Sequence, residues 1–324
     1  MIYGICKSIL ITLVAIGSGF ACADQGRKLP TIGMAVPVDR ATAEPFQNAF
    51  REGMRNLGYV DGENVVIIER FANGDPAKLR KSIKELIALH VDILMGEAPL
   101  LKEMTTTIPI VSPTMGDPVK TGLVASLARP GGNLTGVSGQ SYDIWPKQLE
   151  LAKELVSNLR HICLLFDKND EPNAVTNANT EFRALARGIG ITVRTLQVGS
   201  LDDLRAALKT IQKERPQALV VWLSPLLNLH HQMIMDSIAH RMPVIGEGRE
   251  FAEAGALLTY SVDWRDMFRR SAAYVDKILK GARLGDLPIE QPTKFELIVN
   301  LKAAKALRLN VPQSILLRAD EVIR

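Results

Sequence analysis

Residues 108–138 read IPIVSPTMGDPVKTGLVASLARPGGNLTGVS. The apolar run at residues 108–111 is typical of a strand that is buried in a parallel sheet. Residues 134–137 predict a second strand, and the Pro-Gly-Gly-Asn turn at residues 130–133 separates it from the segment before. The loop at residues 112–116 would follow the carboxyl end of a strand, which is where open α/β sheets bind their ligands.

The segment between these two strands carries the signals of a helix. Asp117 stands at the N-cap position and Pro118 at the first helical position, where both residue types are favoured. Val119, Leu123 and Leu127 recur at helical spacing, which predicts one buried face. The whole stretch is therefore predicted to form a strand, a loop, a helix, a tight turn and a strand.

Helical and strand-like patterns alternate along the chain, which indicates an α/β fold with parallel sheets. The patterns predict strands at residues 31–36, 65–69, 91–95, 162–166, 192–196, 218–223, 243–246 and 257–261, and helices at residues 45–57, 76–89, 145–155, 174–189, 201–213, 231–240 and 264–279.

The alternation forms two units, residues 30–138 and 143–258, with no low-complexity linker between them. We assign residues 264–290 to the first lobe and residues 295–324 to the second. Two Rossmann-like lobes joined by extended hinge strands would form a clamshell, with a ligand in the cleft between the lobes.

Residues 1–23 resemble a secretory signal peptide. Lys7 precedes an apolar stretch at residues 8–20, which is too short to span a bilayer. Ala21-Cys22-Ala23 fits a cleavage site. The alternative is a lipoprotein anchored through Cys22, although the residues before it fit that signal poorly. Both interpretations predict an exported protein.

The composition excludes several classes of function. The chain has 39 basic and 35 acidic residues, which are intermixed and give a net charge of +4. We therefore expect no strong positive electrostatic field that would attract nucleic acid or an acidic membrane surface. Dinucleotide-binding, P-loop and nucleophile-elbow motifs are missing, and the histidines lack metal-ligand spacing. Cys163 stands alone in an apolar run, which favours a structural role. We expect no enzyme activity, no cofactor and no metal.

Residues 108–138 resemble the signature of the ABC-transporter substrate-binding proteins related to the tryptophan-binding type. They contain IPIV, DPV, GLVASL, PGGN and TG in the order of that family. Residues 49–65, 246–264 and 274–323 are similar to the family as well. The resemblance implies a type I periplasmic binding protein fold. It also implies capture of a small solute outside the inner membrane and delivery to an ABC permease with its ATPase. Members with known ligands resemble aromatic amino-acid binders.

The chain departs from the family pattern at two places. Gly96-Glu97-Ala98-Pro99 replaces a Gly-Gly-Thr-Pro-Ala loop, and the helix that follows looks shortened. An anionic Glu97 would disfavour a carboxylate and favour a cationic or neutral group. Tyr260-Ser261-Val262-Asp263 replaces Tyr-Gly-Pro-Asp. The identity of the ligand therefore stays open. A further alternative is that this chain is a copy of the family that has lost ligand binding.

Polar side chains after predicted strands are candidates for ligand contacts. Gly96 and Glu97 are two of these candidates. Thr114 is a third, because the sequence predicts no structural role for it. Ser224 is a fourth and follows the strand at residues 218–223. Glu247 follows the next strand and is the preferred partner for an ammonium group. Asp39 lies in the loop after the first strand.

Five further candidates each have a structural alternative. Asp117 either caps its helix, which we favour, or faces the ligand. Ser138, Tyr260 and Asp263 lie at the predicted crossings between the lobes. Each of them either forms part of the hinge or contacts the ligand. Tyr142 beside a crossing would either stack on a planar ligand or pack in the core.

The sequence thus predicts a periplasmic solute-binding component of an ABC importer. Its ligand would be a small molecule such as an amino acid or a related compound. Its partners would be the permease and ATPase, with membrane contact through the permease or a lipid anchor at Cys22. The alternatives are a sensory receptor subunit of the same fold and a secreted α/β enzyme, for which the sequence offers no acid–base pair.

Overall fold

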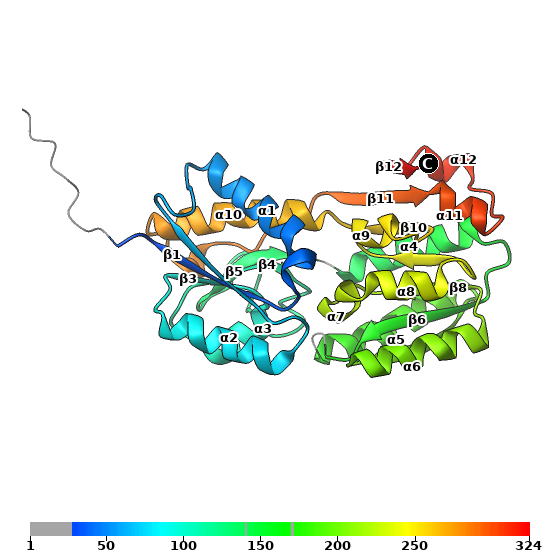
Figure 1. Ribbon diagram of the computed structural model, residues 1–324, viewed down its shortest axis with the longest axis horizontal. Helices are drawn as coiled ribbons and strands as arrows, with labels where there is room; N and C mark the ends of the chain where they lie inside the picture. Colours follow the sequence, from blue (N-terminus) through cyan, green and yellow to red (C-terminus); the bar gives the residue numbers. More distant parts are fainter. Residues whose placement is uncertain (1–27, 140, 170–171) are drawn as a thin grey trace, which may run out of the picture.

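The computed structural model describes residues 28–139, 141–169 and 172–324, and the side chains of residues 141–143 and 172–178 are not described. Two α/β lobes lie side by side (Figure 1). The predicted signal peptide, including Cys22, lies outside the described residues. Within the described ranges, no helix is both long and apolar enough to cross a membrane.

The first lobe is built on a five-stranded parallel sheet with the order β2-β1-β3-β4-β5. Its strands are β1 (Thr31–Val36), β2 (Val66–Phe71), β3 (Ile93–Met95), β4 (Ile110–Met115) and β5 (Leu134–Ser138). Its helices are α1 (Arg40–Asn56), α2 (Pro76–Ala88) and α3 (Ala98–Met104), with α10 (Trp264–Leu279) and the short 3₁₀ helix η1 (Leu284–Asp286) added from later in the chain.

Side chains that alternate along β1 build both cores of the first lobe. Ile32, Met34 and Val36 pack in one cluster with α1 and α10. Ala35 belongs to a second cluster with α2 and α3. Because successive residues of a strand point to opposite faces, helices cover both sides of the sheet, as Figure 1 shows. The long apolar strand signals therefore reflect burial on both faces.

The second lobe contains a seven-stranded sheet with the order β12-β11-β10-β9-β8-β6-β7, in which the pair β10–β11 is antiparallel. Its strands are β6 (His161–Asp167), β7 (Thr192–Val198), β8 (Ala218–Val221), β9 (Val244–Gly246), β10 (Leu258–Val262), β11 (Phe295–Asn300) and β12 (Glu321–Ile323). Its helices are α4 (Ser141–Leu155), α5 (Pro172–Gly188), α6 (Leu201–Glu214), α7 (Pro225–Leu229), α8 (His231–Ile238), α9 (Arg249–Glu253), α11 (Leu301–Ala306) and α12 (Gln313–Leu316).

Side chains that alternate along β6 likewise contribute to two hydrophobic clusters, one on each face of the second sheet. Ile162 and Phe166 belong to the cluster that includes α4 and α5. Cys163 and Leu165 belong to the opposite cluster, with α6 and α8. Burial raises the pKa of Cys163 to about 12, so its thiol stays protonated. The prediction of an α/β fold with parallel-sheet lobes is confirmed.

The chain passes from one lobe to the other after β5, after β10 and again before β11 (Figure 1). These crossings are tied together by backbone hydrogen bonds. The Ser138 N–H donates to the Glu290 carbonyl at 2.8 Å, and the Asp263 N–H donates to the Lys294 carbonyl at 3.3 Å. The lobes are thus joined by adjacent extended segments, which is the arrangement of a hinge.

The helix predicted after Asp117 is wrong, although its cap is present. Asp117 Oδ1 accepts the N–H groups of Val119 and Lys120 at 3.1 and 3.0 Å, but the segment continues as turns. Gly122 has φ of +73°, which a right-handed helix does not accept. Val119 is 42% exposed, so its apolar side chain does not belong to a buried face.

The loop predicted at residues 112–116 is also wrong in its extent, because β4 continues to Met115. The pairing of β4 with β5 shifts register between Ser112 and Met115. Gly136 of β5 lies opposite Ser112 with φ of +140°, and an added Cβ would lie 2.0 Å from the Ser112 carbonyl oxygen. The bulged pairing of these strands therefore requires glycine at position 136.

We expect Gly136→Ala to lower the free energy of unfolding by roughly 3 kcal/mol or more, because backbone atoms must move to admit the methyl group. Gly132→Ala is the matched control. Gly132 also has positive φ, but an added Cβ there meets nothing within 4 Å, so its cost should stay at about 1–2 kcal/mol. Urea unfolding followed by circular dichroism measures both, and equal losses would contradict the close approach.

Candidate ligand-binding site

A cavity of about 610 Å³ lies between the lobes, within the size range of small-molecule sites. The first lobe lines it with residues at or after the carboxyl ends of β1, β2, β3 and β4, and the second lobe with residues at or after the ends of β6, β7 and β8. These include residues 34–38, 74–76, 95–100 and 113–116 from the first lobe, and residues 167, 169, 199, 223–226 and 228 from the second. Both sheets therefore present the edge that binds ligands in α/β folds.

Aromatic side chains form part of the first-lobe wall. Phe46 of α1 and Phe268 of α10 line the cavity with Trp264, and the two phenyl rings lie 5.5 Å apart at an interplanar angle of 39°. Met34 and Met95 add further apolar surface. A wall of this kind binds the apolar body of a solute by burial and ring contacts.

Buried polar atoms without partners occur on the same wall and on the opposite one. Gln47 Nε2, Trp264 Nε1 and Asn228 Oδ1 have no hydrogen-bond partner among the described residues, and all three residues line the cavity. Gln47 is 3% exposed and Asn228 is 7% exposed. A buried polar group without a partner costs about 1–3 kcal/mol, and a polar ligand would supply the missing hydrogen bonds.

Asp167 is the buried acid of the cavity. It ends β6 and is 7% exposed, and its Oδ1 accepts the Asn169 N–H at 2.8 Å. Burial raises the pKa of Asp167 and outweighs the hydrogen bonds from Asn169 and Ser224. Ser224 also caps α7, because its hydroxyl accepts the Leu227 N–H at 3.2 Å.

The charged residues that line the cavity in the described part of the chain are Asp75, Arg80, Glu97, Glu103 and Asp167. Arg80 binds Glu103 through two hydrogen bonds, at 2.9 and 3.0 Å. Asp75 caps α2 by accepting the N–H groups of its first turn. Carboxylates thus outnumber cations in the lining, and its guanidinium is already paired.

The structure places some of the predicted site residues on the cavity and others away from it. The predicted residues Gly96, Glu97, Thr114 and Ser224 line the cavity. The remaining described candidates do not belong to this lining. They are Asp39, Asp117, Ser138, Glu247, Tyr260 and Asp263. The side chain of Tyr142 lies outside the described residues.

Three of these remaining candidates have structural contacts. Asp39 accepts the Thr42 N–H at 2.8 Å and caps α1. The Ser138 hydroxyl donates to the Gly116 carbonyl at 2.8 Å. Tyr260 stacks on Phe295, with ring centroids 5.9 Å apart.

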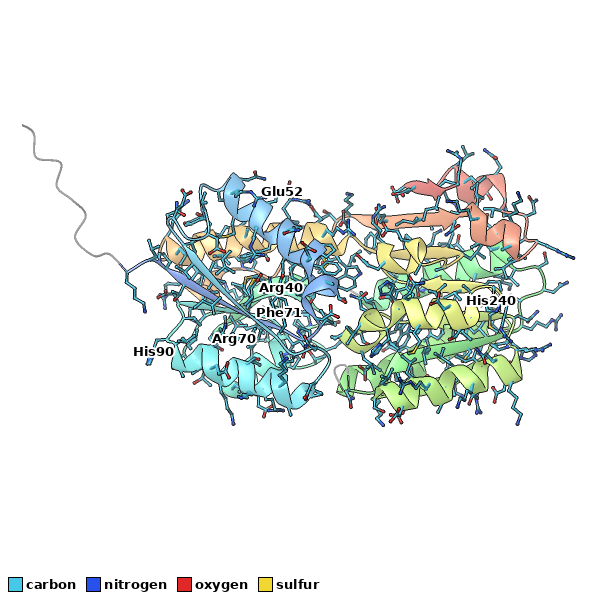
Figure 2. The ribbon with its side chains drawn as sticks, viewed as in Figure 1. Arg40, Glu52, Arg70, Phe71, His90 and His240 are labelled. Carbon is cyan, nitrogen blue, oxygen red and sulfur yellow. The ribbon has the colours of Figure 1, made fainter. Side chains whose placement is uncertain are left out.

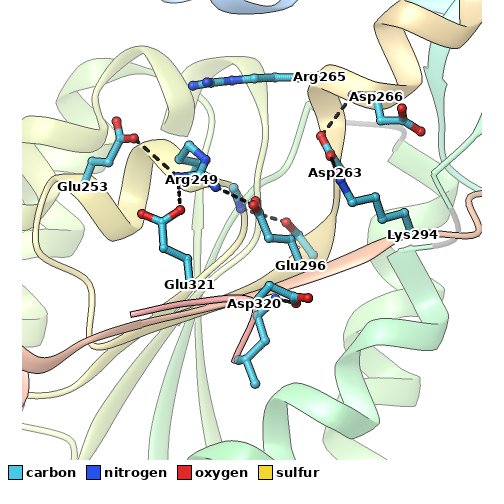
Figure 3. A network of polar contacts seen from close by, with 12 residues as sticks. Arg249, Glu253, Asp263, Arg265, Asp266, Lys294, Glu296, Asp320 and Glu321 are labelled. Atoms are coloured by element: carbon cyan, nitrogen blue, oxygen red, sulfur yellow. Dashed lines mark hydrogen bonds and ion pairs between the residues drawn. The ribbon is translucent and has the colours of Figure 1, made fainter. Parts of the chain in front are cut away.

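Asp263 belongs to a network of ion pairs at the crossings (Figure 3). Its carboxylate accepts from Lys294 Nζ at 2.9 Å and from the Asp266 N–H at 3.0 Å. Burial raises its pKa, but these hydrogen bonds outweigh burial and hold the pKa below its usual range. Nearby, Arg265 of α10 binds Glu250 of α9 at 3.1 Å. Because α9 and α10 belong to different lobes, this ion pair stabilises the present arrangement of the lobes.

Glu247 follows β9 as predicted, but its side chain is buried and 3% exposed. Burial raises its pKa to about 8, partly offset by hydrogen bonds from the Leu223 backbone and the Gln148 side chain. At neutral pH the carboxyl is therefore mostly protonated and carries little charge.

The sequence interpretation missed Phe46, Gln47, Asp167 and Asn228. Asp167 directly follows the strand predicted at residues 162–166, so the rule that selected Ser224 would have found it as well. Phe46 and Gln47 lie on α1, and their place on the cavity depends on tertiary packing. The histidines stay away from the cavity lining in the described structure, and Figure 2 shows His90 and His240 at the outer parts of the two lobes.

Comparison with known proteins agrees with this architecture. Residues 31–323 match the family of ABC transporter substrate binding proteins. The chain belongs to this family. Its members are extracytoplasmic solute-binding proteins and not enzymes.

Individual relatives extend the comparison. The ABC domain from Streptococcus pneumoniae in complex with L-Trp is 26% identical, covers 91% of this chain and 100% of its own, and has a TM-score of 0.84. The tyrosine-binding protein of Clostridioides difficile (strain R20291) is 23% identical over 291 residues, which are 87% of this chain and 82% of the relative.

A more distant structure shows the fold alone. The periplasmic binding protein/LacI transcriptional regulator from Alkaliphilus metalliredigens, complexed with D-xylulofuranose, is 14% identical. It covers 82% of this chain and 96% of its own, with a TM-score of 0.58. The substrate-binding protein described here has the type I periplasmic binding protein fold, as the sequence predicts.

We expect the buried Glu247 to make stability depend on pH. Its pKa is raised from 4.5 to about 8 in the folded protein, so its contribution is fully present below about pH 4.5 and is lost as the pH rises to about 8. Glu247→Gln should abolish this loss, and the variant should gain stability over wild type increasingly with pH. Thermal unfolding at several pH values from about 5 to about 8 measures the difference.

Glu63→Gln is the control for this series, because it makes the same chemical change at a side chain that is exposed in a turn. A constant offset between wild type and Glu247→Gln at all pH values would show that Glu247 is already ionised.

Proposed function

We propose that this protein is the solute-binding component of an ABC importer, and that it delivers a small molecule from its interlobe cavity to a permease. The observation that carries the proposal is the cavity itself, whose walls come from both lobes. A solute in this position touches both lobes and therefore has a higher affinity for the closed protein than for the open one. Such a difference in affinity shifts the equilibrium toward closure.

Contacts around the cavity support a closed arrangement of the lobes. Leu229 of α7 packs against the core of the first lobe, and an added Cβ on Gly74 would lie 2.8 Å from Leu229 Cδ2. Lys120 of the first lobe lies 3.8 Å from Glu181 of α5. Rotation about the crossings would separate these surfaces and open the cavity to solvent.

The relatives and the cavity wall together favour an amino acid or a related compound with an apolar body. The two relatives that bind tryptophan and tyrosine handle solutes with an aromatic ring. Here Phe46, Trp264 and Phe268 offer a surface for such a ring. Hydrogen bonds to Gln47 and Asn228 would fix its orientation.

The proposed location is the periplasm. The leader-like pattern at residues 1–23 supports export, and the family is extracytoplasmic. The permease and its ATPase would be the partners, and the closed form of the protein would be the form that docks on the permease.

We expect at least one small solute in a library of amino acids, amines and small acids to raise the melting temperature. At a concentration of 100 times Kd the stabilisation is about 2.7 kcal/mol. Thr114→Trp should abolish this shift, because the larger side chain fills part of the cavity that Thr114 lines. Differential scanning fluorimetry measures the shift. Uptake of the same solute should stop when the gene is deleted and return with wild type, but not with Thr114→Trp.

Thr107→Trp serves as the control, since Thr107 is exposed in a bend between α3 and β4 and does not line the cavity in the described structure. This variant should keep both the shift and the uptake. If no solute in the library moves the melting temperature, or if Thr114→Trp binds as wild type does, the proposal is wrong.

A further inference from the structure

Each lobe contributes a carboxylate to the interlobe cavity. Asp167 ends β6 in the second lobe, and Glu97 follows β3 in the first lobe. Both residues line the same cavity. We propose that the solute is an organic cation, an amine with an apolar body and no carboxylate, which binds between these two acids. This inference rests on the proposed function, because it names the chemical class of the solute.

Among the described residues, no cationic side chain forms an ion pair with Asp167, and the neighbouring Lys168 acts on its pKa only as a nearby charge. The described contacts of Asp167 are the Asn169 N–H and the Ser224 hydroxyl, which are neutral donors. The adjacent Lys168 instead lies 3.3 Å from Asp203. A buried carboxylate is costly unless it is paired, and an ammonium group in the cavity would supply the pair. The raised pKa of Asp167 reflects the same cost.

The basic side chain among the described lining residues already has an acidic partner, and so does Arg40, which does not line the cavity. Arg80, which lines the cavity, is held by Glu103 in a bidentate pair. Arg40 lies 3.6 Å from Glu69 and over the ring of Phe71, 4.5 Å from its centroid, and Figure 2 shows Arg40 and Phe71 close together. Within the described lining, a carboxylate ligand would therefore obtain a cation only by breaking the pair of Arg80 and Glu103.

An independent observation points to a donor on the ligand. Asn228 lines the cavity from the second lobe, is 7% exposed, and its Oδ1 lacks a hydrogen-bond partner in the described structure. An ammonium group has three N–H donors and would satisfy this acceptor as well as the Asp167 carboxylate. The rings of Phe46, Trp264 and Phe268 also favour a cation, through cation–π contacts.

Two neutral hydrogen-bond donors on the cavity wall are the groups that could bind the carboxylate of a zwitterionic solute. Gln47 Nε2 and Trp264 Nε1 are unpartnered in the described part of the chain, and they would donate hydrogen bonds to a carboxylate or to a neutral hydroxyl or carbonyl oxygen. A carboxylate at these donors would share a closed cavity with Glu97 and Asp167 without an unpaired cation in the lining. Like charges in a medium of low dielectric repel strongly, so a neutral oxygen fits these donors better.

The test uses matched sets of probes with the wild-type protein. Phenethylamine, phenylalanine and 3-phenylpropanoate share one body and differ in charge, and the corresponding indole and isobutyl sets vary the body. We expect an amine to bind at least tenfold more tightly than its zwitterion in isothermal titration calorimetry, and the acid not to bind. The affinity of the amine should fall as the pH is lowered, because protonation of Asp167 removes its charge.

Variants locate the interaction. Asp167→Asn should weaken amine binding at least tenfold, and Glu97→Gln should weaken it as well. Asp202→Asn is the control, since the Asp202 side chain is 90% exposed and pairs with Arg205, and it should bind the amine as wild type does. The selectivity of the wild type decides the question even if Asp167→Asn fails to fold.

The outcomes separate this inference from the proposed function. A zwitterion or an acid that binds as tightly as its matched amine, and loses binding in Thr114→Trp, overturns the charge assignment but supports a solute-binding protein. Unchanged amine affinity in both Asp167→Asn and Glu97→Gln also overturns the assignment. Absence of binding by every amine overturns the inference, and absence of binding by the whole solute library overturns the proposed function too.

Discussion

The direction of the strands is the constraint on which the site depends. In a parallel sheet all strands end at the same edge, so the loops that follow them collect there. Strands β1 to β4 of the first lobe and β6 to β8 of the second all supply residues to one cavity at these ends. The antiparallel pair β10–β11 lies elsewhere in the second sheet, where β10 leads the chain into the first lobe and β11 receives it on its return. The polypeptide thus builds one site from residues more than 100 positions apart, such as Thr114 and Asn228.

The close packing of α1 on α10 connects this site to the hinge. An added Cβ on Gly53 of α1 would lie 2.4 Å from the Arg269 carbonyl oxygen of α10, so the two helices approach as closely as glycine allows. This approach brings Phe46 and Phe268 together on the cavity wall. Helix α10 begins directly at a crossing, where Asp263 caps it and pairs with Lys294. A rotation at this crossing therefore moves the first-lobe wall as a rigid unit, which is how ligand contact and lobe movement become coupled.

The local signals in the sequence were sufficient for most elements. The bounds of β1 and α10 agree with the predicted 31–36 and 264–279, because the residue patterns that predict these two elements are local features of the sequence. The helix after Asp117 failed, since a cap and apolar spacing do not reveal that Gly122 adopts positive φ. For the site, the strand-end rule placed Glu97, Thr114 and Ser224 on the cavity lining. The same rule cannot tell which way a side chain points, so Glu247 was selected although it is buried. Gln47 and Phe268 lie on helices, and their place follows from packing between elements distant in sequence.

The acidic residues on the two lobes make the free energy of closure depend on the charge of the solute. On the proposed assignment, closing the lobes brings Glu97 and Asp167 from opposite walls into a volume from which water is excluded. Repulsion between like charges grows as the dielectric constant falls, so these two acids oppose closure when no cationic solute lies between them. A cation between them turns the same geometry into attraction, and the free energy of closure then depends on the charge of the solute. A ligand shifts a conformational equilibrium only by its difference in affinity for the two states. Carboxylates on opposing lobes make that difference largest for an amine, and they disfavour closure around an acid that fits the same apolar wall.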